Sequence, residues 1–484
     1  MRSFSQSIIA NNSRTTVLLG GALRVAAVVL AIIYLAPQSA DYREVMIIGG
    51  ALIAGVIVLG GEWGIRLGFV LWALSMAIGY RTFEVKKDLR IHPAEVLLWL
   101  LFTCVLAHRR LITENRVSLP MWVCLSMPFW LFGWWPLIAG DAEWAGMLSE
   151  FRSFVIFIPL LFVAQIVLKQ KQDWRYVLTA FFLASTWIAF MGSLEYWVPS
   201  VMRLFPAFIK SAKAEAAADG FVRAQFSFWG NQSATFLCLL ACPLALVLIR
   251  WWRGLLARVA IVTSAVLQLV AIYIGGFRSI WLMVVVQVAA GCFFGLRKRG
   301  LVVAALCVLV AAVGYQLIPK TEERVITTIA VLQGAPIDHS ALVRQERALG
   351  AVDHIVENPL GSGWHSAGWV HSDFLQVGAN LGILAALIFV GGYLFTFWKL
   401  AVTVKTASAY PRSAAGELGF PLLLSFIGVG GLLATQGVEV LPQLMLPVWF
   451  IWVMVDVWLR QRSEATELSY AYAPSNFYPA ANLQ

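Results

Sequence analysis

Residues 344–384 read RQERALGAVDHIVENPLGSGWHSAGWVHSDFLQVGANLGIL, a charged, glycine-punctuated stretch between two long apolar runs. Four of the six histidines in the chain fall in this stretch or just before it: His339, His354, His365 and His371. Titratable side chains are rare in membrane-embedded chains and mark the places that handle polar ligands. The apolar flanks therefore indicate a membrane fold, and the stretch itself is the first candidate for a functional site.

The composition of the whole chain supports a membrane fold. Of its 484 residues, 60% are hydrophobic and 13% are charged, whereas soluble domains have about 45–50% apolar and about 25% charged residues. A spanning helix needs about 20 mostly apolar residues, and the chain holds many such runs. The sequence therefore predicts an all-α polytopic membrane protein, with the first apolar run retained as a helix rather than cleaved.

The apolar runs predict about 12–14 transmembrane helices. The shorter runs 45–61 and 93–107 could be re-entrant, which would leave about twelve. The fourteen runs lie near residues 16–36, 45–61, 63–80, 93–107, 120–139, 151–168, 177–197, 227–249, 255–276, 279–296, 301–318, 374–398, 419–436 and 442–459.

The net charge of the chain is +10. We attribute most of it to basic cytoplasmic loops, which are typical of membrane proteins, rather than to nucleic-acid binding. We take the C-terminus, with Arg460 and Arg462, as cytoplasmic and assign the loops alternately to the two sides. The loops assigned to the cytoplasm are then basic, and 319–373 is the one large outer loop. Other outer loops are 81–92, 140–150 and 198–226. The loop 81–92 is basic although it falls outside, so either it binds an anion or one N-terminal helix is miscounted.

Within the large loop, residues 341–357 have helical periodicity. Leu342, Leu349, Val352 and Val356 form one apolar stripe, and Arg344, Arg347 and His354 lie on roughly the opposite side. Asn358-Pro359 ends the helix, because proline disfavours helical geometry in the residue before it. We expect an amphipathic helix on the outer face of the membrane domain, with a cationic side.

Arginines gather on the predicted outer side. Arg278 interrupts an otherwise apolar stretch, Arg223 lies just before a helix, and Arg344 and Arg347 lie on the amphipathic helix. Arginine presents a planar fork of donors that fits phosphate oxygens, so these four positions are candidates for binding a diphosphate, and Arg278 is also a candidate catalytic residue. A snorkelling or pore-lining structural role for Arg278 is the alternative.

His371, at the entrance of the helix near 374–398, is a candidate general base, because a histidine titrates near pH 6.5 and can accept a proton from a hydroxyl. Asp373 could orient it or could cap the following helix. A structural histidine is the competing interpretation. We expect no metal and no cofactor, since His365 and His371 have no companion cluster of Cys or carboxylates. The tryptophans Trp364 and Trp369 could stack on sugar rings.

Three motifs resemble a known family. Arg344 is followed after fifteen residues by Pro359, then by LGSG at 360–363 and by HSDFLQ at 371–376 with Gly382 beyond it. Two further segments are IGGFRSIWL, with Phe277 where a serine is usual, and FVRAQFSFWGNQ, with Gly230 in place of a proline. Over residues 220–400 the chain resembles the O-antigen ligase/polymerase family.

The resemblance implies a metal-independent, inverting glycosyltransferase of the bacterial inner membrane, with its site facing the periplasm. Its donor would be a glycan on undecaprenyl diphosphate, held by the arginines matching Arg223, Arg278 and Arg344. The histidine matching His371 would activate the hydroxyl of the acceptor, which could be a second glycan, lipid A-core or another molecule. The partners would thus be these substrates and membrane lipids, and not nucleic acid.

The expected organisation follows. Residues 1–219 form N-terminal transmembrane helices, 220–400 form the ligase-like catalytic region with the periplasmic loop 319–373, 401–462 form C-terminal transmembrane helices, and 463–484 form a disordered tail. Polymerase and ligase activities both fit. The alternative from another class is a polysaccharide flippase or secondary transporter, although a transporter typically has broken helices in two related halves.

Overall fold

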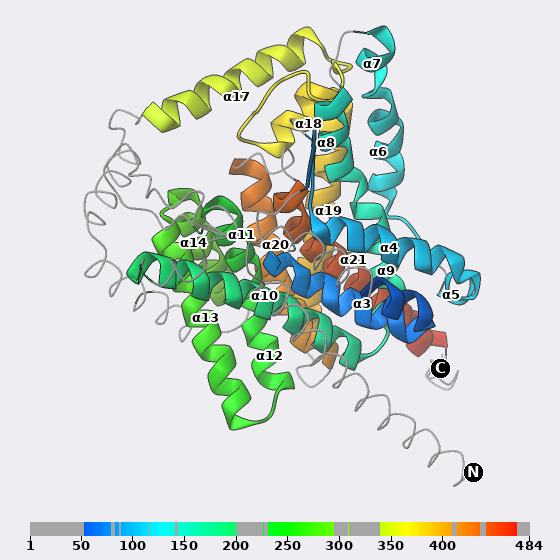
Figure 1. Cartoon of the computed structure of the whole chain (residues 1–484), viewed down its shortest axis with the longest axis vertical. Helices are drawn as coiled ribbons and strands as arrows, with labels where there is room; N and C mark the ends of the chain where they lie inside the picture. Colours follow the sequence, from blue (N-terminus) through cyan, green and yellow to red (C-terminus); the bar gives the residue numbers. More distant parts are fainter. Residues whose placement is uncertain are drawn as a thin grey trace, which may run out of the picture.

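The computed structural model describes residues 53–78, 83–86, 89–115, 117–140, 144–198, 231–294, 339–408, 414–435 and 442–471, together with residues 200, 226 and 308. Helices dominate this part of the chain (Figure 1). A short antiparallel hairpin of β1 (Phe83–Lys86) and β2 (Leu89–Ile91) is its only sheet. The two 3₁₀ segments are Met76–Ile78 and Cys242–Leu244.

The α-helices of the described residues are α3 (Gly61–Ser75), α4 (Pro93–Ala107), α5 (Arg109–Asn115), α6 (Met121–Phe132), α7 (Trp135–Ala139), α8 (Trp144–Val155), α9 (Phe157–Val167), α10 (Lys171–Trp197), α11 (Asn231–Ala241), α12 (Ala245–Trp251), α13 (Leu255–Gly275), α14 (Arg278–Phe293), α17 (His339–Glu357), α18 (Asp373–Leu381), α19 (Ile383–Ser408), α20 (Ala414–Thr435) and α21 (Pro442–Ala471).

Eight helical segments of the described residues are long and apolar enough to cross a membrane. This confirms the prediction of an α-helical, multi-pass membrane protein. The run near 16–36 lies outside the described residues, as does the run near 301–318 except for residue 308, and the run near 45–61 is described from residue 53 and is helical over 53–59. The eight segments are Met121–Ala139, Trp144–Val167, Lys171–Trp197, Gln232–Trp251, Leu255–Gly275, Ile383–Thr406, Glu417–Thr435 and Leu444–Ser463.

Two expected boundaries were wrong. The run predicted as one helix near 374–398 is divided into α18 and α19 at Gly382, whose φ of +92° is incompatible with a continuous helix. The tail predicted to be disordered from 463 is helical as far as Ala471, because α21 continues through SEATELSYA, a segment rich in good helix formers. Residues 472–484 lie outside the described residues.

The centre of the bundle is built on α21. Its Trp449 and Trp452 are fully buried and contact Trp122, Phe157 and Phe389 from three other helices, with ring centroids 4.8–6.3 Å apart. Aromatic rings bury a large apolar area at low entropic cost. This packing fixes the helices around α21 and forms the rigid base on which the outer segments rest.

Buried polar side chains tie the helices together by bonding to main-chain carbonyls. The Gln287 amide of α14 donates to the carbonyls of Leu239 and Leu424, on α11 and α20, over 3.4 and 2.9 Å. Such hydrogen bonds between helices satisfy donors that have no water in the membrane interior. They hold α14, which begins at Arg278, in a defined position against the bundle.

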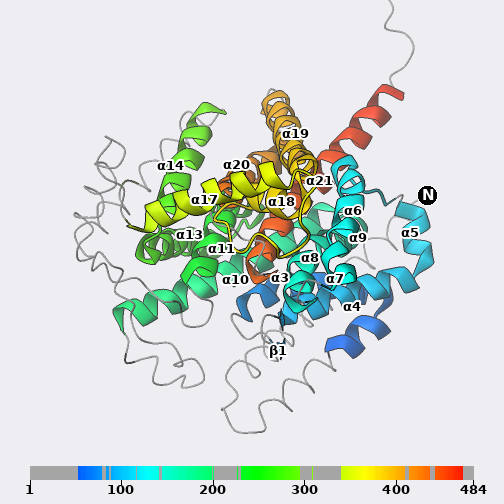
Figure 2. The ribbon, with the colours of Figure 1, turned by 90° about the horizontal axis from the view of Figure 1, so that it is seen from above.

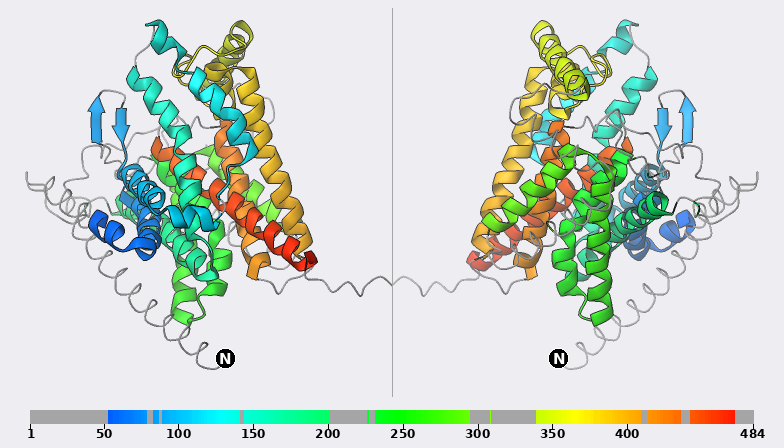
Figure 3. Two further views of the ribbon diagram at one scale, coloured as in Figure 1. Left: turned by 90° about the vertical axis from the view of Figure 1, so that its right-hand side faces the viewer. Right: turned by 90° about the vertical axis from the view of Figure 1, so that its left-hand side faces the viewer.

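The two ends of the bundle carry different segments. In Figure 1, α7, α17 and α18 lie at the top, and the turn between α12 and α13 lies at the bottom. The β1–β2 hairpin lies toward the same end as α17, while α19 ends at the opposite one (Figure 3). Of the predicted outer loops, the basic loop 81–92 and residues 339–373 of the large loop thus lie toward one end of the described residues, whereas the loop 198–226 lies almost wholly outside them.

The amphipathic helix predicted at 341–357 is present as α17, and it crosses over the bundle when viewed from above (Figure 2). Ala351 is buried and Ile355 packs toward α18. The predicted apolar stripe faces away from the protein: Leu342, Leu349, Val352 and Val356 are 44%, 57%, 43% and 74% exposed. On the cationic side, Arg344 and His354 are half-buried and Arg347 is exposed, so this side is only partly turned toward the protein.

Candidate functional site

The loop between α17 and α18 is folded by its glycines. Gly361, Gly363 and Gly368 have φ values of +88°, +99° and +65°, a region that other residues seldom adopt. Gly382 allows a close approach as well, since a Cβ there would lie 2.6 Å from the carbonyl carbon of Leu360. The LGSG motif and Gly382 thus pack the start of the loop against the junction of α18 and α19.

Trp364 anchors the middle of the loop to α6. Its indole Nε1 donates to the Trp130 carbonyl over 2.9 Å, and its main-chain N–H donates to the Gly133 carbonyl over 2.9 Å. The side chain is only 1% exposed, and a Cβ on Gly133 would come within 2.5 Å of the indole nitrogen. The suggestion that Trp364 stacks on a sugar is wrong, because its ring is part of the core.

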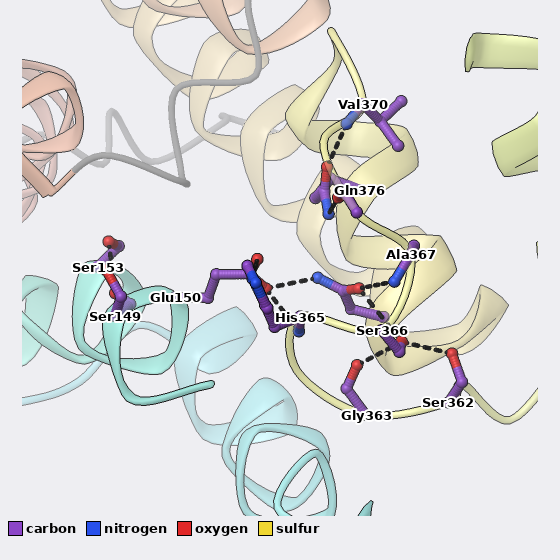
Figure 4. A network of polar contacts seen from close by, with 12 residues as sticks. Ser149, Glu150, Ser153, Ser362, Gly363, His365, Ser366, Ala367, Val370 and Gln376 are labelled. Atoms are coloured by element: carbon purple, nitrogen blue, oxygen red, sulfur yellow. Dashed lines mark hydrogen bonds and ion pairs between the residues drawn. The ribbon is translucent and has the colours of Figure 1, made fainter. Parts of the chain in front are cut away.

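Glu150 of α8 anchors the neighbouring residue (Figure 4). One carboxylate oxygen accepts from the His365 main-chain N–H and from the Asn380 amide, both over 2.8 Å. The other oxygen lies 2.7 Å from His365 Nδ1. Hydrogen bonds to a charged acceptor are among the stronger ones, so this buried carboxylate fixes the loop to the membrane helices.

Two amides of α18 complete the anchoring. Asn380 Oδ1 accepts from the Ala367 N–H over 3.2 Å. Gln376 accepts from the Val370 N–H over 2.7 Å and donates to the Gly368 carbonyl over 2.6 Å. Gln376 therefore brackets Trp369 on both sides and fixes the backbone that leads to His371.

A line of hydroxyls connects the loop to α17. His354 Nε2 is hydrogen-bonded to Ser362 Oγ over 2.6 Å, and Ser362 Oγ to Ser366 Oγ over 2.5 Å. Gly378 lets α17 pack directly on α18, because a Cβ there would meet the Ile355 side chain at 2.8 Å. The histidine predicted on the cationic side of the helix thus holds that side toward the loop.

The cationic side of α17 meets Trp369 and His371. The Arg347 guanidinium carbon lies 5.3 Å from the centre of the Trp369 ring, a cation–π distance. The Trp369 and His371 rings are 4.3 Å apart with a tilt of 53°. The structure therefore brings together Arg347, Trp369 and His371, with Arg344 near enough to His371 to act on its charge.

The environment keeps His371 neutral. Burial of the ring lowers its pKa to about 4, and the positive charges of Arg344 and Arg347 contribute in the same direction. Desolvation and a nearby like charge both disfavour the imidazolium form. At neutral pH this imidazole holds an unshared electron pair and can accept a proton.

Asp373 does not orient His371 through Nδ1, which has no hydrogen-bond partner among the described residues. Ser372 is the N-cap residue of α18, and Asp373 lies in its first turn, fully buried. A carboxylate at that place is favoured by the helix dipole. Asp373 therefore lies inside the first turn of α18 rather than at its N-cap position.

The other predicted arginines are placed differently. Arg223 lies outside the described residues. Arg278 is the first residue of α14, after the N-cap residue Phe277. The start of α14 follows the end of α13, which runs upward from the α12–α13 turn in Figure 1. Among the described cations, Arg344 and Arg347 are the ones that act on His371. The helix dipole opposes a cation at a helix start, so helix stability does not explain Arg278.

Within the described residues, no group of three or more His, Cys, Asp or Glu side chains could hold a metal ion. The histidines of the loop are instead engaged separately, His354 with Ser362 and His365 with Glu150.

Comparison with known proteins gives no relative. No protein-family model matches this chain, and no curated protein matches it significantly.

Proposed function

We propose that this protein is a membrane-embedded glycosyltransferase that moves a glycan from a polyprenyl diphosphate to an acceptor hydroxyl. The observation that carries the proposal is the cluster of Arg344 and Arg347 beside a neutral His371. A diphosphate leaving group needs cations, and an attacking hydroxyl needs a base. These two requirements meet on one side of α17.

In the proposed reaction, the acceptor oxygen attacks the anomeric carbon while the bond from that carbon to the diphosphate oxygen breaks. The His371 imidazole takes the hydroxyl proton, and the electron pair of the broken bond leaves with the diphosphate. Arg344 and Arg347 offset the charge that grows on the leaving group, and Arg223 and Arg278 are proposed to join them. Attack from the side opposite the leaving group inverts the anomeric configuration.

We place the site at the periplasmic face of the bacterial inner membrane. Support comes from the common location of α7, α17, α18 and the β1–β2 hairpin toward one end of the bundle. Undecaprenyl diphosphate is the expected lipid carrier, on the resemblance of residues 220–400 to O-antigen ligases and polymerases. The acceptor class is either a second lipid-linked glycan, for a polymerase, or a different molecule such as lipid A-core, for a ligase.

The test is a reaction of the purified protein in nanodiscs with a diphosphate-linked repeat-unit oligosaccharide, first alone and then with lipid A-core. A ladder of longer lipid-linked glycans indicates a polymerase, and transfer only after addition of lipid A-core indicates a ligase. Loss of product with His371→Ala and Arg344→Ala is expected. Arg253→Ala is the control, because that exposed arginine lies in the α12–α13 turn at the opposite end.

A transporter would behave differently in the same system. If neither condition gives product from intact substrate, and vesicles containing the protein carry the lipid-linked glycan across the membrane, the transferase proposal is wrong.

A further inference from the structure

Glu150 belongs to a part of the chain that the family resemblance does not cover. It lies on α8, within the membrane segment Trp144–Val167, and its side chain is 1% exposed. Its three hydrogen bonds all go to the loop and its support: to the main chain and ring of His365 and to Asn380 of α18. A buried carboxylate is costly unless its oxygens are satisfied, and here the loop satisfies them.

The geometry at His365 is specific rather than a relaxed contact. His365 has a φ of +65°, a left-handed conformation that is unfavourable for a residue with a Cβ. The ring lies against Gly146, one turn before Glu150, where a Cβ would come within 2.5 Å of the ring carbon Cδ2. Such strain persists only when the surroundings impose it, and α8 imposes it here through Glu150 and Gly146.

The hydrogen bonds from Glu150 continue toward His371. Asn380, which donates to Glu150, accepts from the Ala367 N–H. On the next turn of α18, Gln376 holds the Gly368 carbonyl and the Val370 N–H. The segment that leads to His371 is thus held at two places, by Glu150 and Asn380 at residues 365–367 and by Gln376 on either side of Trp369.

We propose that Glu150 is a positioning residue for the transfer reaction, which fixes His371 and Trp369 against the cationic side of α17. The inference rests on the proposed function. Glu150 does not touch the reacting atoms, and it acts through His365 and Asn380. Without it, the loop loses its hydrogen bonds to α8, while the arginines remain on a helix that still packs on α18 through Ile355 and Gly378.

The predicted signature is a change in turnover without a matching change in donor binding. Glu150→Ala lowers kcat for glycan transfer by about tenfold to a hundredfold, since small misplacements of a catalytic group have effects of this size. The KM for the lipid-linked donor stays within about twofold of the wild-type value, because the arginines that bind diphosphate keep their places. Glu150→Gln is the conservative variant, because its amide oxygen can still accept from the His365 N–H and from Asn380, and it recovers most of the lost turnover.

Glu95→Gln is the matched control. Glu95 of α4 is also buried, at 1% exposure, and it pairs with Arg152 of α8 over 3.1 Å, whereas its contacts among the described residues do not include the loop 361–372. Its loss weakens the attachment of α8 without releasing residues 361–372. If Glu95→Gln and Glu150→Ala lower kcat equally, or if Glu150→Ala has wild-type kcat, the positioning role is wrong.

Hydrogen exchange separates this inference from the proposed function. In the full-length protein in nanodiscs, Glu150→Ala is expected to speed amide exchange in peptides covering residues 361–372 and to leave peptides of α20 unchanged, whereas Glu95→Gln leaves both unchanged. Unchanged exchange in 361–372 overturns the inference even if the enzyme transfers glycans. Faster exchange in a protein without transferase activity keeps the ordering of the loop by Glu150 and rejects the function assigned to it.

Discussion

The guanidinium carbon of Arg347 lies 5.3 Å from the ring centre of Trp369. The imidazole of His371 packs against the same indole, with the two ring centres 4.3 Å apart. The Trp369 indole therefore contacts both the Arg347 guanidinium of α17 and the His371 imidazole. The indole is 44% exposed, so these three side chains lie at the protein surface rather than in the core. Trp369 is the residue that fixes the distance between the cationic side of α17 and His371.

Removing that indole should slow the reaction. Trp369→Ala removes the surface on which His371 rests, and we expect transfer activity to fall by about tenfold or more, because the base loses its orientation. Trp369→Phe keeps an aromatic face and should retain most of the activity. Turnover measured with saturating donor tests this, and equal activity of Trp369→Ala and wild type would contradict it.

The contact between Arg347 and Trp369 should appear as an energetic coupling. A double-mutant cycle with Arg347→Ala and Trp369→Ala in thermal or denaturant unfolding is expected to give about 0.5–1 kcal/mol of interaction free energy, the size of an exposed cation–π contact. Strict additivity of the two substitutions would mean that the contact is not made in solution.

The acid limb of the pH–rate profile should depend on the arginines. Transfer requires neutral His371, so kcat/KM for the wild type should fall as the pH drops through the His371 pKa of about 4. Arg344→Gln removes a positive charge that disfavours the imidazolium, so the pKa rises toward its ordinary value of 6.5.

The acid limb of this variant is therefore expected at higher pH. The shift is partial, because burial of the ring is the larger cause and remains. An acid limb that stays in place or moves to lower pH would show that Arg344 does not act on the base.

Gly382 should be intolerant of any side chain. Its φ of +92° and the closeness of the Leu360 carbonyl leave no room for a Cβ, so Gly382→Ala is expected to destabilise the protein by more than about 1 kcal/mol. Gly391→Ala is the control, because it lies in α19 with open space around it and should gain up to about 1 kcal/mol from helix propensity. Melting temperatures in one detergent compare the two.

The ion pair of Glu95 and Arg152 predicts an asymmetric effect on stability. Arg152→Met leaves a buried carboxylate without its cation and should cost about 3–5 kcal/mol, whereas replacing both partners with apolar residues of similar volume should cost much less. Denaturation of the single and double variants decides between these outcomes. A double variant as unstable as Arg152→Met would contradict the prediction, because the unpaired charge would then not be the cause of the lost stability.

The sequence predicted the local features of this site and missed the long-range ones. The periodicity of residues 341–357 correctly indicated an amphipathic helix with Arg344 and Arg347 opposite the apolar stripe, because helical spacing alone decides which residues share a face. It did not indicate which face meets the rest of the protein, and the cationic side proved to be the one that meets residues 362–371. The side of a helix that packs on the protein is decided by the neighbouring segments, and the periodicity of the helix carries no information about them.

The contact of Glu150 with His365 spans 215 residues of chain, and no local pattern marks it. A single glutamate in an apolar run was the available signal, because a carboxylate in a membrane segment needs partners. The helix break at Gly382 was missed for a related reason. An apolar run shows no interruption there, and the need for a positive φ arises from the approach of residues 359–360, which only the folded chain reveals.

The position of Arg344 and Arg347 beside His371 has a consequence for the reaction under the proposed function. They hold His371 in a weakly basic state while the site is empty of anions, and a bound diphosphate would offset their charge and make the imidazole a stronger base. Linkage makes this reciprocal: the side chain that gains proton affinity when the donor binds also strengthens donor binding once it is protonated. The imidazole would then be most basic in the complex that already holds the lipid-linked donor, which is the complex in which the acceptor hydroxyl must lose its proton.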